Sequence, residues 1–176
     1  MSIVEDLSRQ ILLEHLNPDE IEKVSKVVEK IKYSTNDSIF TETQPTKGIY
    51  MINYGEVEVS KKLSIDLKTK MLITLRNVQH CCDIRKTSDG WKQVFAKLIE
   101  GFFFGELSIV EGKVKHGADA VALEETEVYL IPTAKFNALC DANPVLLIKI
   151  MKTIAKSASK NVRHLDRQLL KILIGY

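Results

Sequence analysis

The chain has 176 residues, 45% apolar and 27% charged, and a formal net charge of +2. This composition is typical of a soluble globular protein, and the length fits one well-packed domain with an appended helix. No apolar run approaches membrane-spanning length, and acids stand near the N-terminus where a signal peptide would be basic, so we expect no membrane insertion and no signal peptide. Three cysteines, two of them adjacent, predict a cytoplasmic protein with reduced thiols.

The chain is expected to begin with two amphipathic helices. Apolar residues recur at helical spacing over residues 3–16. Asn17 is typical of a helix N-cap, with Pro18 at the first helical position and Glu20 at the third. The same spacing carries the second helix through Ile31.

From Tyr33 onward the pattern changes to short strands separated by polar turns. The segment 48–59 reads as a hairpin, and Gly55 is predicted to take a backbone angle that a residue with a Cβ would resist. Residues 91–99 form another expected strand after the turn Ser-Asp-Gly-Trp. The segment 63–86 contains an expected insertion. It includes His80, Cys81 and Cys82, but no second Cys or His pair stands at metal-site spacing, so we predict no metal site.

The stretch 101–122 carries the strongest functional pattern. Aromatic residues 102–104 predict a strand, Gly105 interrupts it, and Glu106 begins a turn or short helix. A polar loop at 111–115 leads to small and β-branched residues over 118–123. A strand, a glycine and a helical turn bring several backbone N–H groups together, which suits an anion.

The C-terminal part reads as a strand over 127–132, a short helix over 133–141 capped by Thr133, and a long helix opened by Asn143 and Pro144. The long helix repeats seam residues at alternating intervals of four and three, which predicts a homodimeric coiled coil through 147–172. These residues are Leu147, Met151, Ile154, Ala158, Asn161, Leu165, Gln168 and Ile172. The alternative is a single helix lying on its own domain. From residue 145 the chain carries a net charge of +6, an expected solvated basic surface.

The stretch 101–122, together with the hairpin 48–59, resembles the phosphate-binding cassette and preceding hairpin of the cyclic nucleotide-binding domain, as in bacterial catabolite-activator and Fnr regulators. The cassette pattern is matched in order by Phe104, Gly105, Glu106, Leu107, Ser108 and Ile109. The resemblance implies an α+β fold: an antiparallel β-roll flanked by N-terminal helices and a long C-terminal dimerisation helix. It implies a domain over 1–142, with the insertion at about 63–86, and a coiled-coil-type helix over 143–176.

The resemblance also implies site residues. Glu106 would accept the ribose 2′-hydroxyl, and the amides of Leu107 and Ser108 after Gly105 would hold the cyclic phosphate. Gly117 and Ala118 would add another N–H, and Asn161 would face the base. His116 stands where the family has its phosphate-gripping arginine. We expect nearby Glu106 to raise the pKa of His116, and Lys113 or Lys115 to be substitute cations.

No catalytic motif is present, so we predict a non-catalytic regulatory module with weakened or altered binding of a cyclic nucleotide or other small anion. The alternative is a ligand-free dimerisation or protein-interaction module that keeps only the fold. The resemblance would place a DNA-binding domain after the long helix, and we expect no sequence-specific DNA binding by this chain alone.

Overall fold

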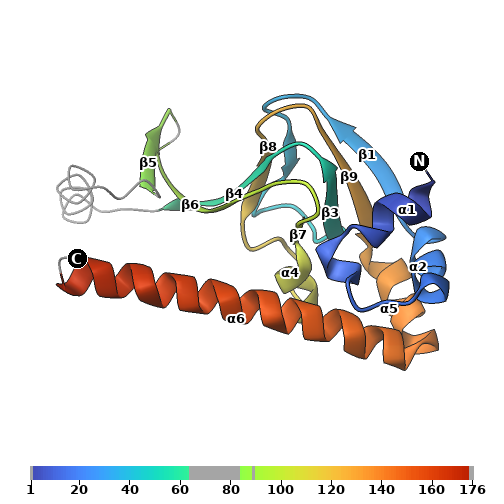
Figure 1. Cartoon of the computed structure of the whole chain (residues 1–176). Coiled ribbons are helices and arrows are strands. Elements are labelled where there is room, and N and C mark those ends of the chain that lie inside the picture. Colours follow the sequence, from blue (N-terminus) through green and yellow to red (C-terminus); the bar gives the residue numbers. More distant parts are fainter. Residues whose placement is uncertain (1, 64–83, 89, 175–176) are drawn as a thin grey trace. The chain divides into compact units, whose positions relative to one another are not determined.

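The computed structural model describes residues 2–63, 84–88 and 90–174 (Figure 1). At residues 84, 164, 165 and 168–174 it describes the backbone only. The chain forms two compact units. One comprises residues 1–28 with 134–176, and the other comprises residues 29–133.

The unit of residues 29–133 is an antiparallel β-roll of two sheets, as the sequence predicts. The four-stranded sheet has the order β1 (Glu29–Tyr33), β9 (Thr126–Pro132), β3 (Gly48–Tyr54) and β7 (Phe103–Phe104). The five-stranded sheet has the order β2 (Ser38–Phe40), β8 (Asp119–Ala122), β4 (Val57–Leu63), β6 (Gly90–Leu98) and β5 (Ile84–Thr87). In the expected Ser-Asp-Gly-Trp hairpin, Thr87 pairs with Gly90. Most of the predicted insertion, including the whole His80-Cys81-Cys82 run, lies outside the described residues.

The core of the roll lies between the sheets. Buried side chains of both sheets form one cluster: Ile39, Phe40, Tyr50, Ile52, Val57, Phe104, Ala120, Ala122, Val128 and Leu130. The hairpin β3–β4 supplies three of these, and its turn residue Gly55 has a φ of +97°. A Cβ on Gly55 would lie 2.4 Å from Oγ1 of Thr126. The prediction that this turn requires glycine is therefore confirmed.

The N-terminal helices are shorter than the sequence predicts. The expected first helix divides into α1 (Ile3–Ser8) and a 3₁₀ turn, η1 (Ile11–Leu13), because Gln10 between them has an extended backbone. In α2 (Pro18–Ser25), Asn17 caps the helix by accepting from the Glu20 N–H at 2.9 Å, as predicted. The prediction that this helix runs through Ile31 is wrong.

Strand β1 replaces the end of the expected second helix. Ile31 pairs with Val128 of β9 in an antiparallel register. Val27, Val28 and Ile31 fit helical spacing, but their β-branched side chains also favour an extended backbone. Pairing with a strand distant in the sequence decides between these two structures.

Short helix α5 (Thr133–Ala142) occupies the expected place. The expected cap at Thr133 is wrong, because its buried hydroxyl has no hydrogen-bond partner in the described part of the chain. The backbone N–H of Thr133 instead donates to the Lys47 carbonyl at 2.9 Å.

The long helix α6 (Pro144–Ile174) begins where the sequence predicts. Its first half buries Leu146, Ile150, Thr153 and Ile154. It contacts η1 within the same unit, and the Lys149 ammonium binds the Glu20 carboxylate at 2.7 Å. This half therefore packs on its own unit, and the homodimer through residues 147–172 stays a prediction.

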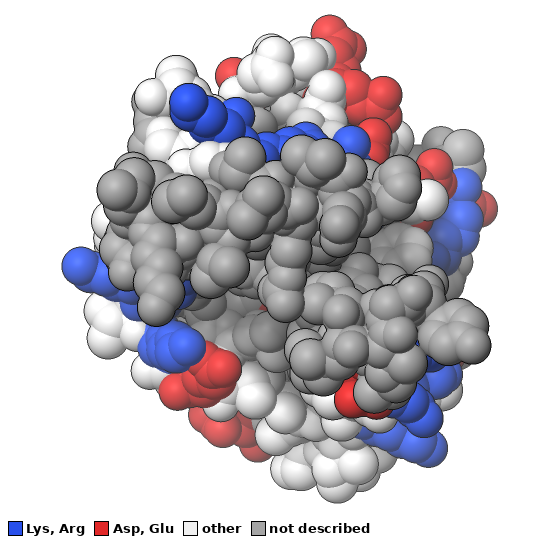
Figure 2. Space-filling view, turned by 90° about the vertical axis from the view of Figure 1, so that its left-hand side faces the viewer, with Lys and Arg blue, Asp and Glu red and all other residues white. Residues whose placement is uncertain are grey.

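Among the described residues, no helix is both long enough and apolar enough to cross a membrane. On the face shown in Figure 2, described lysines and arginines stand in several groups, with aspartates and glutamates between them. The described residues visible on that face therefore form no single large patch of one charge.

Candidate functional site

The candidate site begins where β7 ends. Phe103 and Phe104 pair with β3, opposite Met51 and Tyr50. Gly105 follows with a φ of +84°, and a Cβ there would lie 2.9 Å from the Gly48 carbonyl oxygen. Only glycine combines this backbone angle with such a close approach. The chain then enters α4 (Glu106–Val110), with Glu106 at its first position.

Ser108 holds the returning loop against α4. Its carbonyl accepts from the Lys113 N–H at 2.8 Å, and its buried hydroxyl accepts from the Gly117 N–H at 3.3 Å. The backbone N–H of His116 donates to the Gln44 carbonyl at 3.1 Å, which ties the loop to the segment before β3. The two ends of the cassette therefore lie together, as the sequence pattern implies.

His116 is packed into the β-roll, with only 2% of its surface exposed. Its ring stacks on Phe40, with centroids 3.7 Å apart and 7° between the planes. Its Nε2 accepts from the Lys47 N–H at 3.4 Å, so the neutral ring carries its hydrogen on Nδ1. Nδ1 is buried and has no protein partner among the described residues.

Burial, with a smaller contribution from the charge of Lys47, lowers the pKa of His116 to about 4. The expectation that Glu106 raises this pKa is therefore wrong. The desolvation of the ring outweighs any attraction to a carboxylate, and His116 is uncharged at neutral pH.

The Glu106 carboxyl is half-buried, and burial raises its pKa to about 7. The backbone N–H groups of Glu106 and Leu107 act on the pKa in the opposite direction but are outweighed by burial. In the part of the chain that the structure describes, no lysine or arginine forms an ion pair with it. The Glu106 carboxyl is therefore partly protonated near pH 7, and no cation among the described residues compensates its charge.

An aromatic wall connects the two ends of the cassette. We use this name for Phe40, Tyr50, Phe104 and His116. The rings of Tyr50 and Phe104 stack at 5.1 Å, and the ring of Phe40 lies 5.3 Å from that of Tyr50. Tyr50 is fully buried, its hydroxyl has no hydrogen-bond partner within the described residues, and burial raises its pKa.

The structure brings together most of the residues predicted for the site. Gly105, Glu106, Leu107 and Ser108 form the start of α4, and His116, Gly117 and Ala118 end the returning loop. Asn161 instead lies on α6, in the other compact unit, with an exposed side chain.

The expected substitute cations are both exposed, and Lys113 pairs with Glu111. Sequence reasoning missed Phe40, Tyr50 and the Lys47 amide. Their separate strand patterns contain no signal that these groups meet at His116.

The fold and cassette define a β-roll of a known class, and the chain belongs to the cyclic nucleotide-binding domain family. The family model matches residues 30–143. A cyclic nucleotide-binding domain from Methylobacillus flagellatus has a TM-score of 0.73 at 19% identity, over 96% of this chain and 83% of that one.

Two further structures share the fold. The catabolite activator protein of Thermus thermophilus has a TM-score of 0.65 at 20% identity, over 91% of this chain and 62% of that one. The regulatory subunit of a cAMP-independent protein kinase A from Trypanosoma brucei has a TM-score of 0.67 at 14% identity, over 96% of this chain and 50% of that one. A triple mutant of this subunit, with one substitution to arginine, is bound to cAMP.

Among curated sequences, a lysophospholipase NTE1 from Candida glabrata is 22% identical over 134 residues. The match covers 76% of this chain and 7% of that enzyme. The chain thus spans a small part of that enzyme's length.

Proposed function

We propose that this chain is a non-catalytic regulatory module that binds cyclic nucleotide monophosphates only weakly or in an altered manner. The observation that carries this proposal is the state of His116. At the position of the family's phosphate-gripping arginine, the chain has an uncharged ring stacked on Phe40.

The energetic consequence is large. Replacing the charge-assisted, forked contacts of an arginine removes roughly 3–5 kcal/mol, at about 1.5–3 kcal/mol for each bond. That corresponds to roughly a hundredfold to several-thousandfold weaker binding. Lys113 gives little compensation, because its ammonium pairs with Glu111 on an exposed loop.

The trypanosomal relative supports the proposal by analogy. It is described as cAMP-independent, and its cAMP-bound form carries three substitutions, one of which introduces an arginine. A family member can therefore keep the fold while cyclic AMP does not control it.

The test is calorimetric titration of the wild type and His116→Arg with cyclic AMP. We expect binding to strengthen by at least about a hundredfold in the variant, the lower end of the estimate above. The matched control is His15→Arg, which adds the same charge at an exposed position in the other compact unit. Nanomolar affinity in the wild type would contradict the proposal.

His116→Arg places a longer side chain at a buried position, so its unfolding transition is measured in parallel. If the folded variant shows no binding at millimolar cyclic AMP, the alternative applies. The chain would then be a ligand-free dimerisation or interaction module. The internal hydrogen bonding of the cassette favours that alternative, because the Gly117 N–H already has Ser108 as its partner.

As part of the proposal, the module forms a homodimer through residues 147–172 of α6 and works in the cytoplasm. The buried free thiol of Cys140 is consistent with a reducing compartment. Ile154 is unsuitable for testing the dimer, because it is buried and a lysine there would disrupt the monomer.

Exposed Asn161 is the better site for that test. Asn161→Leu should strengthen dimerisation and Asn161→Lys should weaken it, as measured by sedimentation. A wild type that remains monomeric at high micromolar concentration would contradict this assembly.

A further inference from the structure

The residues just before β3 pair with the returning loop of the cassette. The backbone N–H of Thr46 donates to the Val114 carbonyl at 2.8 Å. A β-bridge joins Pro45 to Lys115 in antiparallel register. The two segments therefore run side by side, and the end of the segment before β3 lies next to His116.

Lys47 is the last residue of that segment, and its backbone lies between the two ends of the cassette. Its N–H donates to Nε2 of His116 at 3.4 Å, and its carbonyl accepts from the Thr133 N–H at 2.9 Å. The next residue, Gly48, reaches the other end of the cassette. Its carbonyl oxygen would lie 2.9 Å from a Cβ on Gly105. The backbone contacts of Lys47 and Gly48 thus connect His116 with Gly105.

The side chain of Lys47 is available to a ligand. It is exposed, and in the part of the chain that the structure describes its ammonium forms no ion pair. Lysine carries its charge on a flexible four-carbon stem, so this ammonium can reach a phosphate bound at the cassette. The charge of Lys47 also contributes to the low pKa of His116, which is consistent with an ammonium close to that ring.

The two lysines of the returning loop are less suitable for this role. The ammonium of Lys113 pairs with Glu111. Lys115 directly precedes His116 in the bridged segment, and successive side chains of an extended segment point to opposite sides. Because the His116 side chain is buried in the roll, that of exposed Lys115 points away from it.

We infer that Lys47 supplies the cation that contacts the phosphate of a cyclic nucleotide, in place of an arginine at position 116. This inference rests on the proposed function, because it concerns the same ligand and the same site. The positive charge has moved from the returning loop to the segment before β3. A lysine is a point charge without the forked geometry of arginine, so this contact is weaker than the one it replaces. Lys47 therefore accounts for the weak binding that remains.

The test is an NMR titration, which measures millimolar affinities, with cyclic AMP and with adenosine. Adenosine has the same base and ribose but no phosphate. Lys47→Gln should lower the affinity for cyclic AMP by about tenfold or more and leave the affinity for adenosine unchanged. Lys47→Arg should raise the affinity for cyclic AMP, because it adds forked donors at the same place. The structural contacts of Lys47 are made by its backbone, so both variants should fold, and their unfolding transitions are measured in parallel.

Two further substitutions make the comparison specific. Lys97→Gln is the matched control, because it removes the same charge from an exposed position on β6 in the same compact unit. It should change neither affinity. Lys115→Gln tests the neighbouring lysine directly. A loss of cyclic AMP affinity in Lys115→Gln but not in Lys47→Gln would overturn the inference.

The remaining outcomes separate this inference from the proposed function. Nanomolar binding of cyclic AMP by the wild type contradicts the proposed function. Equal cyclic AMP affinities of the wild type and Lys47→Gln overturn only the inference. Equal losses for cyclic AMP and adenosine in Lys47→Gln also overturn it, because the lost contact would not involve the phosphate.

Absence of binding is decisive as well. If neither the folded wild type nor folded Lys47→Arg binds cyclic AMP at millimolar concentration, Lys47 does not provide a phosphate contact and the inference is wrong. The titration of His116→Arg then decides the proposed function independently, because that variant supplies its own cation.

Discussion

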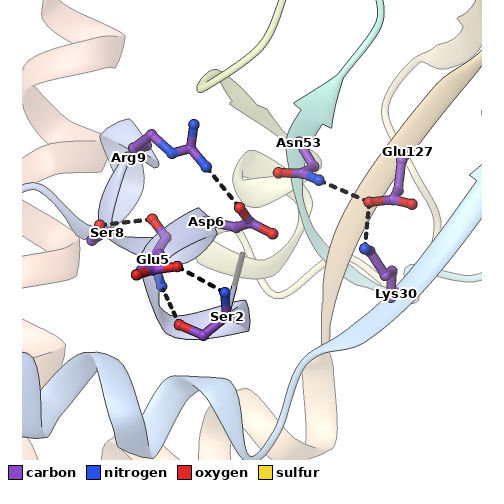
Figure 3. Close-up of polar contacts among 8 residues, drawn as sticks. All are labelled: Ser2, Glu5, Asp6, Ser8, Arg9, Lys30, Asn53 and Glu127. Carbon is purple, nitrogen blue, oxygen red and sulfur yellow. Dashed lines mark hydrogen bonds and ion pairs between the residues drawn. The ribbon is translucent and has the colours of Figure 1, made fainter.

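Two carboxyl groups within the β-roll have opposite surroundings. Glu127 on β9 is almost fully buried, with its side chain 4% exposed. It accepts from Asn53 at 2.7 Å and pairs with Lys30 at 2.7 Å (Figure 3). Burial raises its pKa, but the hydrogen bonds from Lys30 and Asn53 and the charges of Lys30 and Lys32 outweigh this and lower it.

Among the described residues, Glu106 has no such side-chain partners. Burial again raises the pKa, and only two backbone N–H groups oppose it, so the pKa reaches about 7. The comparison teaches that burial alone does not decide the state of a carboxyl group; the partners supplied with it do. Glu127 forms a structural ion pair, whereas burial destabilises the charged form of Glu106 without a compensating cation among the described residues. An uncompensated carboxyl group of this kind is typical of a functional site.

The largest expected effect tests whether the aromatic wall beside the cassette stabilises the fold through apolar packing. Phe40→Ala removes the ring on which His116 stacks and leaves a cavity within the aromatic wall. It should lower the free energy of unfolding by about 3–5 kcal/mol, measured by chemical denaturation. Phe95→Ala is the control, because Phe95 on β6 is 50% exposed and should cost far less. Equal losses for the two variants would show that the wall is not a packed core.

The next effect tests the Glu127 side of the comparison. Glu127→Gln keeps an acceptor for Asn53 but removes the negative charge that Glu127 presents to Lys30 and Lys32, so it should destabilise the fold by about 2 kcal/mol. The exposed neighbour Glu125 provides the control Glu125→Gln, for which we expect little change. A stability of Glu127→Gln equal to that of the wild type would mean that the ion pair only offsets its own desolvation.

The same substitution at Glu106 should have the opposite sign. Because no cation among the described residues compensates this carboxylate, Glu106→Gln should stabilise the fold by about 1 kcal/mol at about pH 8, after allowance for solvent screening. Chemical denaturation of the wild type, Glu106→Gln and Glu111→Gln measures the difference. Destabilisation by Glu106→Gln as large as that by Glu127→Gln would remove the contrast between the two sites.

Much of the fold could be predicted because its signals are local. The cap at Asn17 and the positive φ at Gly55 and Gly105 are each requirements of the local backbone. The start of β1 could not be predicted this way. Residues 27–31 fit helical spacing and strand preference equally, and only pairing with β9 decides. The break between α1 and η1 likewise carried no marker in the pattern of apolar residues.

The site was predictable in its backbone and not in its electrostatics. Glu106 and His116 follow from the order of residues in the cassette. The sequence suggested that they would interact, but the pKa of His116 is decided by burial against Phe40 and by the Lys47 region, which are remote in sequence. A pattern names the residues of a site, whereas their protonation depends on the desolvation that packing produces.

The smallest expected effect concerns how stability changes with pH, and it uses both unusual groups of the cassette. The pKa of Glu106 is raised from 4.5 to about 7, so between these values the folded chain holds a proton that the unfolded chain has lost. Stability from this group therefore falls as pH rises through that window. The pKa of His116 is lowered from 6.5 to about 4, so here the unfolded chain holds the extra proton and stability rises with pH.

The two contributions oppose each other between about pH 4.5 and 6.5, so they partly cancel in the pH dependence of the wild type's free energy of unfolding. Glu106→Gln should remove the falling part, so its stability relative to the wild type should increase as pH rises from about 5 to 7. The slope should be a fraction of the limit of about 1.4 kcal/mol per pH unit for one proton. Chemical denaturation at several pH values measures it, and subtraction of the wild-type profile cancels Glu127 and the other common groups. Exposed Glu111→Gln should run parallel to the wild type. A parallel profile for Glu106→Gln would mean that its carboxyl titrates as it does in the unfolded chain, and the contrast with Glu127 would then rest on hydrogen bonding alone.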